Sequence, residues 1–161
     1  MPIFATAGAK VYIGEVLEAK PTDFVAEDFA GQTWTQINNL ESVGTFGDTA
    51  TEITFDDIGR NRTQKLKGTR NAGNLEMVLG IDYADDGQIA LIAAERTIHD
   101  YAFRVVFNDA PVGGSPSERY FIAKVMSAAE HLDTANNVAK LNATLGINSN
   151  IVRQNPVVAG S

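Results

Sequence analysis

Residues 137–147 have the sequence NVAKLNATLGI, in which apolar residues alternate with polar or small ones from Ala139 onward. Successive side chains of a strand point to opposite faces of a sheet, so this pattern predicts a strand with one buried face. Residues 74–82, NLEMVLGID, show the same period and predict a second strand of the same kind. The apolar residues expected on the buried faces are Ala139, Leu141, Ala143, Leu145, Ile147, Leu75, Met77, Leu79 and Ile81.

Further strands are predicted around this pair. Segments rich in aromatic and β-branched residues predict strands at Tyr101–Phe107 and Arg119–Ser127. The weaker strand signals are Val11–Leu17, Thr33–Ile37, Thr51–Asp57 and Gln64–Gly68. Because few parallel crossovers can be made with one helix, the pattern favours a mainly β fold, an antiparallel β-sandwich or barrel with one flanking α-helix.

The predicted helix covers about residues 85–96. Asp85 is suited to cap the free amides of the first turn, and Gln88, three residues on, completes a capping-box-like pair. Ile89, Ile92 and Ala93 follow the spacing of one helix face. We therefore expect these three side chains to form the apolar stripe that packs on the sheet.

Size and composition indicate one globular domain, residues 1–161. Hydrophobic residues make up 44% and charged residues 20%, which is typical of a chain with a packed core. The longest unbroken apolar stretch, Ile89–Ala94, is far shorter than the roughly 20 residues of a membrane-spanning helix. The chain has no cysteine, and residues 1–10 carry no long apolar secretory stretch, so we expect a cytosolic product with no membrane partner.

Charge is unevenly distributed along the chain. The net charge of −7 disfavours tight binding to nucleic acid, because phosphate binding depends on cationic contacts. A predicted long loop at about 44–62 carries four acidic residues and runs into a basic segment, Arg60–Arg70, that has no acidic one. This arrangement favours electrostatic docking between copies of the chain. A surface loop at Asn108–Ser117 and extended terminal arms at about 1–9 and 151–161 complete the predicted organisation.

No residue pattern makes a positive case for an enzyme. The two histidines, His99 and His131, lie at no recognisable motif spacing, and without cysteine a zinc site lacks its thiolate ligands. Residues 82–87, DYADDG, lack the regular acids of a calcium loop, and residues 113–115 lack the Gly-Lys ending of a phosphate loop. We therefore expect no catalytic residue, no metal and no cofactor.

The order and spacing of short segments along nearly the whole chain resemble the tail tube proteins of long-tailed, siphovirus-like bacteriophages. The segments that carry the resemblance are Trp34–Ile37, Val43–Gly47, Ile53–Asp57, Lys67–Arg70, Gly73–Met77, the helix Ala84–Ala94, the strand around Phe103, Tyr120–Ser127 and Leu145–Ser149. The resemblance implies a structural virion protein that forms stacked hexameric rings, a tube through which phage DNA passes without specific binding. It also implies three partners, the tail tip or baseplate initiator, the tape measure and the tail terminator, and a place in the virion tail after assembly in the host cytoplasm.

The resemblance implies roles for two sets of residues. The 44–62 loop is similar to the family's extended loop that reaches an adjacent subunit or ring, and the terminal arms would bridge rings. The candidate inter-subunit contacts are Asp48, Glu52, Asp56, Asp57, Arg60, Arg62, Lys65 and Lys67. The candidate lumen-lining residues, taken from polar strand faces, are Asn74, Glu76, Asn142 and Thr144. A net acidic protein suits a lumen that repels DNA.

Three other interpretations stay open. An Hcp-like tube protein of a type VI secretion-type contractile machine shares the fold and ring geometry by resemblance, although the long loop and the arms favour a phage tube. A monomeric sugar- or lipid-binding β-sandwich and a hydrolase built around His131 belong to other functional classes. Ring formation, a bound ligand and catalytic activity are the observations that separate them.

Overall fold

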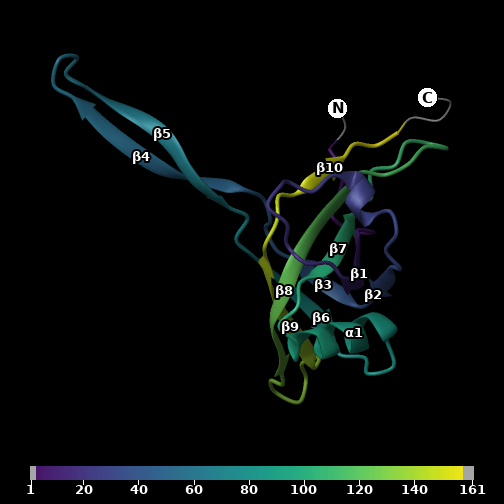
Figure 1. Cartoon of the computed structure of the whole chain (residues 1–161). Coiled ribbons are helices and arrows are strands. Elements are labelled where there is room, and N and C mark those ends of the chain that lie inside the picture. The colour runs from purple at the N-terminus through teal and green to yellow at the C-terminus, as the bar shows by residue number, and fades with distance from the viewer. Residues whose placement is uncertain (1–2, 158–161) are drawn as a thin grey trace.

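The computed structural model describes residues 3–157. Most of its strands form a curved antiparallel sheet, and a hairpin projects from this sheet (Figure 1). Eight strands form the curved sheet, in the order β2-β1-β7-β8-β9-β6-β3 with β10 paired to β8, and β4 and β5 form the hairpin. The elements are β1 (Lys10–Val16), the 3-10 helix η1 (Ala26–Phe29), β2 (Thr35–Ile37), β3 (Leu40–Val43), β4 (Thr49–Asp57), β5 (Arg62–Asn71), β6 (Asn74–Gly80), α1 (Asp86–Glu95), β7 (Tyr101–Val106), β8 (Glu118–His131), β9 (Lys140–Ile147) and β10 (Val152–Gln154).

The main sheet curls because its two edge strands are neighbours in sequence. β2 and β3 lie at opposite ends of the strand order, yet only Asn38 and Asn39 separate them. Asn39 takes the left-handed conformation (φ 62°), which Asn adopts more readily than most residues. Every strand pair within residues 3–157 is antiparallel. The predicted antiparallel sandwich or barrel with a flanking helix is confirmed.

The longest strand, β8, belongs to both halves of the sheet. Residues 118–123 pair with β7, and residues 123–131 pair with β9. A register shift between Val125 and Ser127 marks a bulge, and a bulge bends a strand and increases its twist. One strand can therefore run along two walls of the core.

Apolar side chains from both halves of the sheet fill the enclosed space. The buried residues of this core are Val11, Ile13, Ile37, Ala72, Leu75, Met77, Leu79, Leu91, Ala94, Phe103, Val105, Phe121, Ala123, Val125, Leu141, Ala143, Leu145 and Ile147. They include the alternating residues predicted for residues 74–82 and 137–147, except that Ile81 and Ala139 are half-buried. The Phe103 and Phe121 rings stack with their centroids 5.8 Å apart, an offset arrangement that aromatic pairs favour.

Helix α1 lies across one end of this core and begins where predicted (Figure 1). Asp85 is its N-cap and accepts a hydrogen bond from the Gln88 backbone amide at 3.0 Å. The predicted capping-box pair is wrong, because the buried Gln88 side chain turns inward. It donates to the carbonyls of Asn38 (3.2 Å) and Gly80 (2.9 Å) and accepts from the Asp82 amide (3.0 Å). This amide ties the helix to the β2–β3 link and to the end of β6.

The predicted apolar stripe of α1 is wrong for Ile89 and Ala93, whereas Ile92 packs against the core as predicted. The residues that face the body are Gly87, Gln88, Leu91 and Ala94. Ile89 is half exposed, Ala93 is exposed and Ile92 is half-buried. A Cβ atom on Gly87 would lie 2.2 Å from the carbonyl oxygen of Gln36, so glycine allows the helix to start in contact with β2 and sets which side faces inward.

A second apolar cluster covers the outer face of β7 and β8. Phe24 and Phe29, on the segment that contains η1, pack with Ala102, Tyr120 and Ile122. Burial, together with a hydrogen bond from its hydroxyl to Glu118, raises the pKa of Tyr120 to about 12. β7 and the first half of β8 are therefore covered on both faces.

The strand predictions are confirmed with shifted bounds. Residues 74–82 contain β6, residues 137–147 contain β9, and Tyr101–Phe107 contains β7, while β8 is longer than the predicted Arg119–Ser127. The four weaker signals correspond to β1, β2, β4 and β5. Three elements of three or four residues, η1, β3 and β10, were not predicted, because such short segments show too little of a period.

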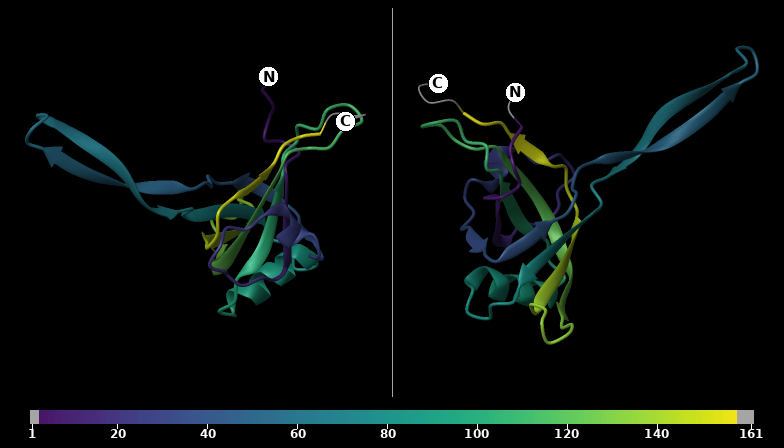
Figure 2. Two further views of the ribbon diagram at one scale, coloured as in Figure 1. Left: turned by 45° about the horizontal axis from the view of Figure 1, so that its top comes forward. Right: turned by 180° about the vertical axis from the view of Figure 1, so that it is seen from behind.

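The segments predicted as terminal arms lie on the body where they are described. The Phe4 ring lies 5.9 Å from the Phe107 ring, and the Asn108 side chain donates to the Ala7 carbonyl at 2.8 Å. The arm predicted from residue 151 is in part β10, which pairs with Glu118–Tyr120 of β8. Both described ends lie at the same end of the body (Figure 2). Residues 1–2 and 158–161 of the predicted arms fall outside the described residues.

Replacing Gly87 by Ala should lower the free energy of unfolding by about 1–3 kcal/mol, because the new methyl group overlaps the β2 backbone. Gly31→Ala is the matched control, since a Cβ atom there meets no atom within 4 Å. Its free energy of unfolding should stay within about 0.5 kcal/mol of the parent value. Urea unfolding followed by circular dichroism measures both, and equal losses in the two variants would contradict the close contact.

Candidate functional site

The β4–β5 hairpin stands away from the rest of the molecule (Figures 1 and 2). Its strands pair with each other and with no other strand of the described chain. Nine residues of strand span about 30 Å at 3.3–3.4 Å per residue. The predicted loop at 44–62 is therefore wrong in kind and extent, because the projecting element is a hairpin of residues 49–71.

The turn of the hairpin, residues 58–61, is held by Asp57. The Asp57 carboxylate accepts a hydrogen bond from the Gly59 amide at 2.9 Å, and its backbone carbonyl accepts one from the Asn61 amide at 3.0 Å. Asn61 takes the left-handed conformation (φ 50°), as Asn does readily in turns. Ile58, inside this turn, is 99% exposed. The tip therefore presents an apolar side chain on an ordered turn.

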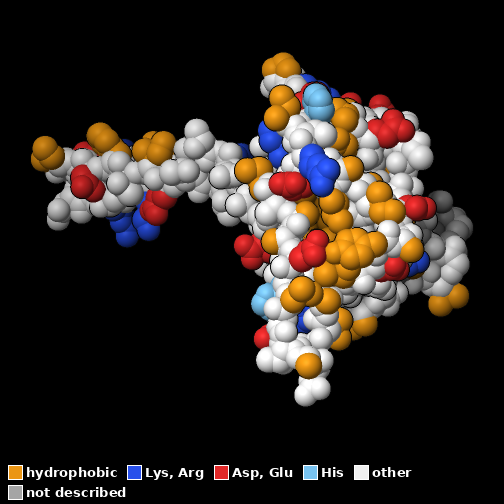
Figure 3. All heavy atoms as spheres, turned by 90° about the horizontal axis from the view of Figure 1, so that it is seen from below, with side chains coloured by type: hydrophobic (Ala, Val, Ile, Leu, Met, Phe, Trp, Pro, Cys, Tyr) orange, Lys and Arg blue, Asp and Glu red, His pale blue; other side chains and the backbone are white. Residues whose placement is uncertain are grey.

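The two faces of the hairpin differ in chemistry. On one face Ile53 lies opposite Leu66, and Phe55 lies two pairs further along, opposite Gln64. These three side chains are 47%, 56% and 59% exposed, in that order. Figure 3 shows hydrophobic side chains along one side of the projecting hairpin and Lys and Arg on the other. We call Ile53, Phe55 and Leu66 the apolar face; contiguous exposed apolar groups of this kind mark interaction surfaces.

The eight predicted inter-subunit residues all lie on or beside the hairpin. On the face opposite the apolar face, Glu52 lies 3.5 Å from the Lys65 ammonium, and Asp56 accepts a hydrogen bond from the Thr63 hydroxyl at 2.7 Å. At the two ends of the hairpin, Asp48 pairs with Arg70 at 3.3 Å and Asp57 with Arg60 at 3.5 Å. Lys67 lies opposite Glu52, and Arg62 lies opposite Asp57. Part of this charge is satisfied within the hairpin, and the role of these residues as contacts stays a prediction.

Sequence reasoning missed the apolar face. Ile53 and Phe55 lie inside the loop predicted at 44–62, whose candidate contact residues are all charged. The available signal was the alternation in residues 51–55, TEITF, which indicated a weak strand with two large apolar side chains on one side. Nothing in that pattern distinguishes a face buried in the body from one left exposed.

Hairpin and body carry opposite net charge. Residues 48–71 contain five basic and four acidic residues, whereas the rest of the chain contains eight basic and sixteen acidic ones. The hairpin is therefore weakly positive and the body strongly negative. Such a distribution favours approach of the hairpin of one copy to the body of another.

The four predicted lumen-lining residues share one face of the sheet. Glu76 on β6 lies opposite Thr144 on β9, so Asn74 and Asn142, two residues away on each strand, project to the same side. Thr144 is half-buried and the other three are exposed. Beside them Lys140 pairs with Glu41 at 2.9 Å. The structure thus brings the four residues together on a polar face, and the place of that face in a lumen stays a prediction.

The loop predicted at Asn108–Ser117 lies at the end of the body that holds both described chain ends. Ser115 exchanges two backbone hydrogen bonds with Val157, at 2.8 and 3.1 Å. Asp109 closes the base of the loop by accepting hydrogen bonds from the amide and the hydroxyl of Ser117. Desolvation by itself raises the pKa of Asp109, but the Ser117 donors, the Asp109 backbone amide and the charge of Arg119 together hold the pKa below its usual value.

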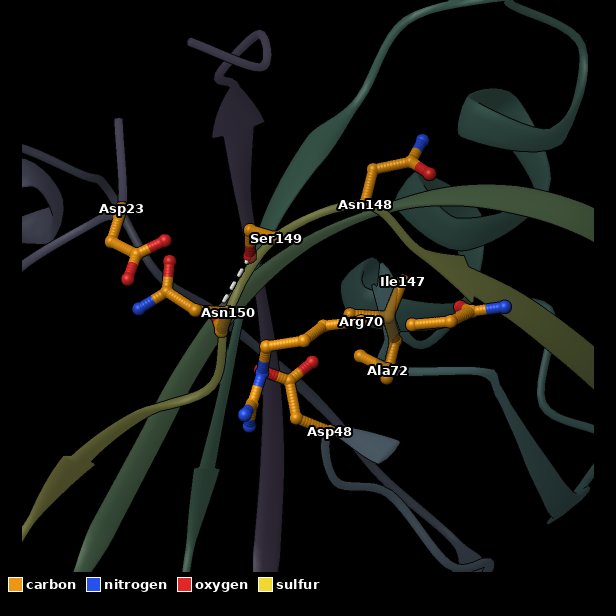
Figure 4. A pocket seen from close by; sticks show the side chains of 9 residues that line it. Asp23, Asp48, Arg70, Ala72, Ile147, Asn148, Ser149 and Asn150 are labelled. Carbon is orange, nitrogen blue, oxygen red and sulfur yellow. Dashed lines mark hydrogen bonds and ion pairs between the residues drawn. The ribbon is translucent and has the colours of Figure 1, made fainter. Parts of the chain in front are cut away.

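A polar groove of about 380 Å³ lies at the root of the hairpin (Figure 4). Asp48 and Arg70 line it from the hairpin, and residues 147–150 line it from the link between β9 and β10. The Asn150 side chain accepts from the Phe24 amide at 2.7 Å and donates to the Phe24 carbonyl at 3.0 Å. Asn150, in the wall of the groove, therefore links Phe24 of the second apolar cluster to the segment that follows β9.

The histidines do not form a reactive pair. The His99 Nδ1 atom lies 2.9 Å from the Glu18 carboxylate, and His131 is exposed at the end of β8 opposite Lys140. Within residues 3–157, no group of three or more His, Cys, Asp or Glu residues is placed to hold a metal ion. None of the helices in that range is long and apolar enough to cross a membrane.

Comparisons with known proteins place the fold. No protein-family model and no curated protein matches the chain. The solved sheath/tube terminator of an extracellular contractile injection system, PVC, in the extended state has a TM-score of 0.68 at 16% identity, over 96% of this chain and 98% of that chain. The SPP1 tail tube has a TM-score of 0.65 at 14% identity, over 97% of this chain and 81% of that chain.

The chain has the tail tube fold. The tube terminating cap of the anti-feeding prophage agrees, with a TM-score of 0.67 at 16% identity over 96% of this chain and 93% of that chain. The resemblance to tail tube proteins that the segment order predicts is thus confirmed for the fold.

Replacing Asn150 by Ala should lower the free energy of unfolding by about 1–3 kcal/mol, because the Phe24 amide and carbonyl lose their partners in a partly buried place. Asn136→Ala, at an exposed position, should change it by less than about 0.5 kcal/mol. Urea unfolding curves of the two variants give both values. A neutral Asn150→Ala variant would show that these hydrogen bonds do not fasten the cluster.

Proposed function

We propose that this chain is the structural protein of a tail tube, in which six copies form a ring and the rings stack into a conduit for phage DNA. The observation that carries the proposal is the exposed apolar face of a hairpin that stands off a body with the tail tube fold. Over residues 3–157 the hairpin pairs with no strand of the body, so a second copy is the natural cover for this surface. The proposed role is structural, with no catalysis.

The physics of the hairpin supports a role in assembly. A two-stranded hairpin alone is marginally stable in water, and this one forms no strand pairs with the described part of the body. When the hairpin of one copy contacts the body of the next, the contact is head-to-tail, and such contacts close into rings or continue as filaments. We place the eight charged hairpin residues beside that contact, where their charges favour encounter between copies.

We infer that the polar face of β6 and β9 lines the lumen. Asn74, Asn142 and Thr144 offer uncharged polar groups, which attract phosphate weakly, and Glu76 repels it. With few cationic contacts, few counterions are released on binding, so DNA would pass without being held.

The proposal places the chain in a virion tail that is assembled in the host cytoplasm. The partners it requires are more copies of the chain, a tail tip or baseplate initiator, a tape measure and a tail terminator. Solved neighbours described as a sheath-tube complex, a tube terminator and a baseplate support assembly with other tail proteins.

The tube of a contractile injection machine, Hcp-like in type, is the second candidate function. It is favoured by the likeness to the PVC sheath-tube complex, with a TM-score of 0.65 at 17% identity. Electron microscopy of native particles separates the two candidates, since a sheath around the tube indicates the contractile machine.

Negative-stain microscopy of the concentrated chain should show rings or tubes, and replacing residues 50–70 by a short Gly-Ser linker should abolish them. The body should still unfold cooperatively in urea, because the hairpin is a separate sheet. Single particles of the intact chain at every concentration would contradict the proposal. A sugar or lipid bound to such particles would favour the monomeric binding protein, and a hydrolase activity lost in His131→Ala would favour the enzyme.

Single cysteines can test the lumen, because the chain has none of its own. Asn142→Cys should react with a bulky polyethylene glycol maleimide before assembly and be protected from it in tubes, while a small maleimide reacts in both states. Ala93→Cys, on the exposed side of α1, is the control and should react with both reagents in both states. Equal labelling of the two positions in tubes would contradict the lumen assignment.

A further inference from the structure

An apolar socket opens beside the root of the hairpin. This cavity of about 230 Å³ is lined by the N-terminal segment, by the link that leads from β3 to the hairpin, and by the end of β7. Its large apolar residues are Phe4, Val43, Phe46, Val105 and Phe107. Phe46 packs on Phe121 of the main core with ring centroids 5.9 Å apart, so the socket directly borders that core.

The hairpin presents a group that matches this socket. Ile58 is 99% exposed at the tip, about one strand length, roughly 30 Å, from the root. The turn that holds it is ordered by the two Asp57 hydrogen bonds. A cavity of 230 Å³ is several times the ~30 Å³ that one water molecule occupies in the liquid, so it has room for a branched aliphatic side chain.

We propose that the hairpin docks through its apolar face and tip on a second copy of this chain, with Ile58 seated in the socket of that copy. The inference rests on the proposed function and adds to it the face that docks, the tip and the receiving cavity. Each chain carries Ile58 at the tip of the hairpin and the socket on the body beside the root of the hairpin. The contact can therefore repeat head-to-tail along an assembly.

Charge supports a second copy as the occupant. The docking segment is weakly positive, and the body that would receive it has twice as many acidic as basic residues. Attraction between the two speeds encounter and orients the hairpin, while burial of apolar surface holds it in place. The same chain therefore supplies both complementary surfaces.

The charged face is the wrong side to dock. Glu52, Lys65 and Asp56 already have partners within the hairpin, and exposed ion pairs of this kind contribute little to stability. Burying them against another protein would remove their hydration without offering new partners. On the other side the three large apolar side chains gain by leaving water, and the polar residues that share that side, Gln64, Asp57 and Arg62, lie toward the tip.

Two double variants separate the faces. Phe55→Thr with Leu66→Thr changes the apolar face, and Asp56→Thr with Lys65→Thr changes the neighbouring residues that point the other way. Threonine favours strands, so both variants keep the strand preference, which circular dichroism checks. By sedimentation, the first should raise the concentration needed for assembly at least about tenfold and the second less than about twofold. The reverse order would overturn the proposal.

A cross-linking experiment keeps the apolar face and Ile58 intact and locates the socket. Arg60→Cys, on the exposed turn, takes a benzophenone maleimide, and mixing isotope-labelled with unlabelled chains shows which cross-links join two copies. We expect intermolecular cross-links to residues 4–9, 43–46 and 105–108. Ala135→Cys, on the β8–β9 turn, is the control and should give none there.

The outcomes distinguish the inference from the proposed function. If the unmodified chain forms no rings or tubes, the proposed function fails and this docking fails with it. If tubes form but the cross-links fall within one chain or elsewhere on a second copy, the socket is wrong while the proposed function stands.

Discussion

The two-residue link between β2 and β3 is the constraint on which the rest of the structure depends. These strands are the opposite edges of the main sheet, and Asn38 with Asn39 must join them, so the sheet has to curl until its edges meet. Curling encloses the core. The Gln88 side-chain amide holds the two edges together by donating hydrogen bonds to the carbonyls of Asn38, in the β2–β3 link, and of Gly80, at the end of β6. A buried amide with three hydrogen bonds fixes the position of the helix more closely than apolar packing alone, because each bond has a preferred direction.

The same closure excludes the hairpin from the body. β3 and β6 pair directly with each other, and the whole of residues 44–73 lies between them in sequence. Within residues 3–157 the strands of the main sheet pair without this insertion, and β4 and β5 pair only with each other. An element that adds nothing to the core of its own chain, and yet carries large apolar side chains, is suited to contacts with another copy.

The sequence predicts the body better than the site, for a physical reason. Strict alternation in residues 74–82 and 139–147 reports burial on one face, and the structure buries the apolar residues of that face except Ile81 and Ala139, which are half-buried. The stripe of α1 could not be predicted from spacing, because the close approach of Gly87 to β2 and the inward amide of Gln88 are tertiary contacts. The hairpin shows the opposite limit: Ile53 and Phe55 have the pattern of a buried face, yet they are 47% and 59% exposed in the structure.

The hairpin also shows how an exposed strand pair can avoid indiscriminate association. Free strand edges invite further strands, and charged side chains, lysine above all, oppose this. Lys65 and Lys67 on β5 and Glu52 on β4 put charge on both edge strands, on the face opposite the apolar face. Association through the edges is thereby disfavoured and association through the face is left available. A face fits only a surface of matching shape, whereas an edge accepts any strand, so this division of charge and apolar surface favours one defined partner over disordered aggregation.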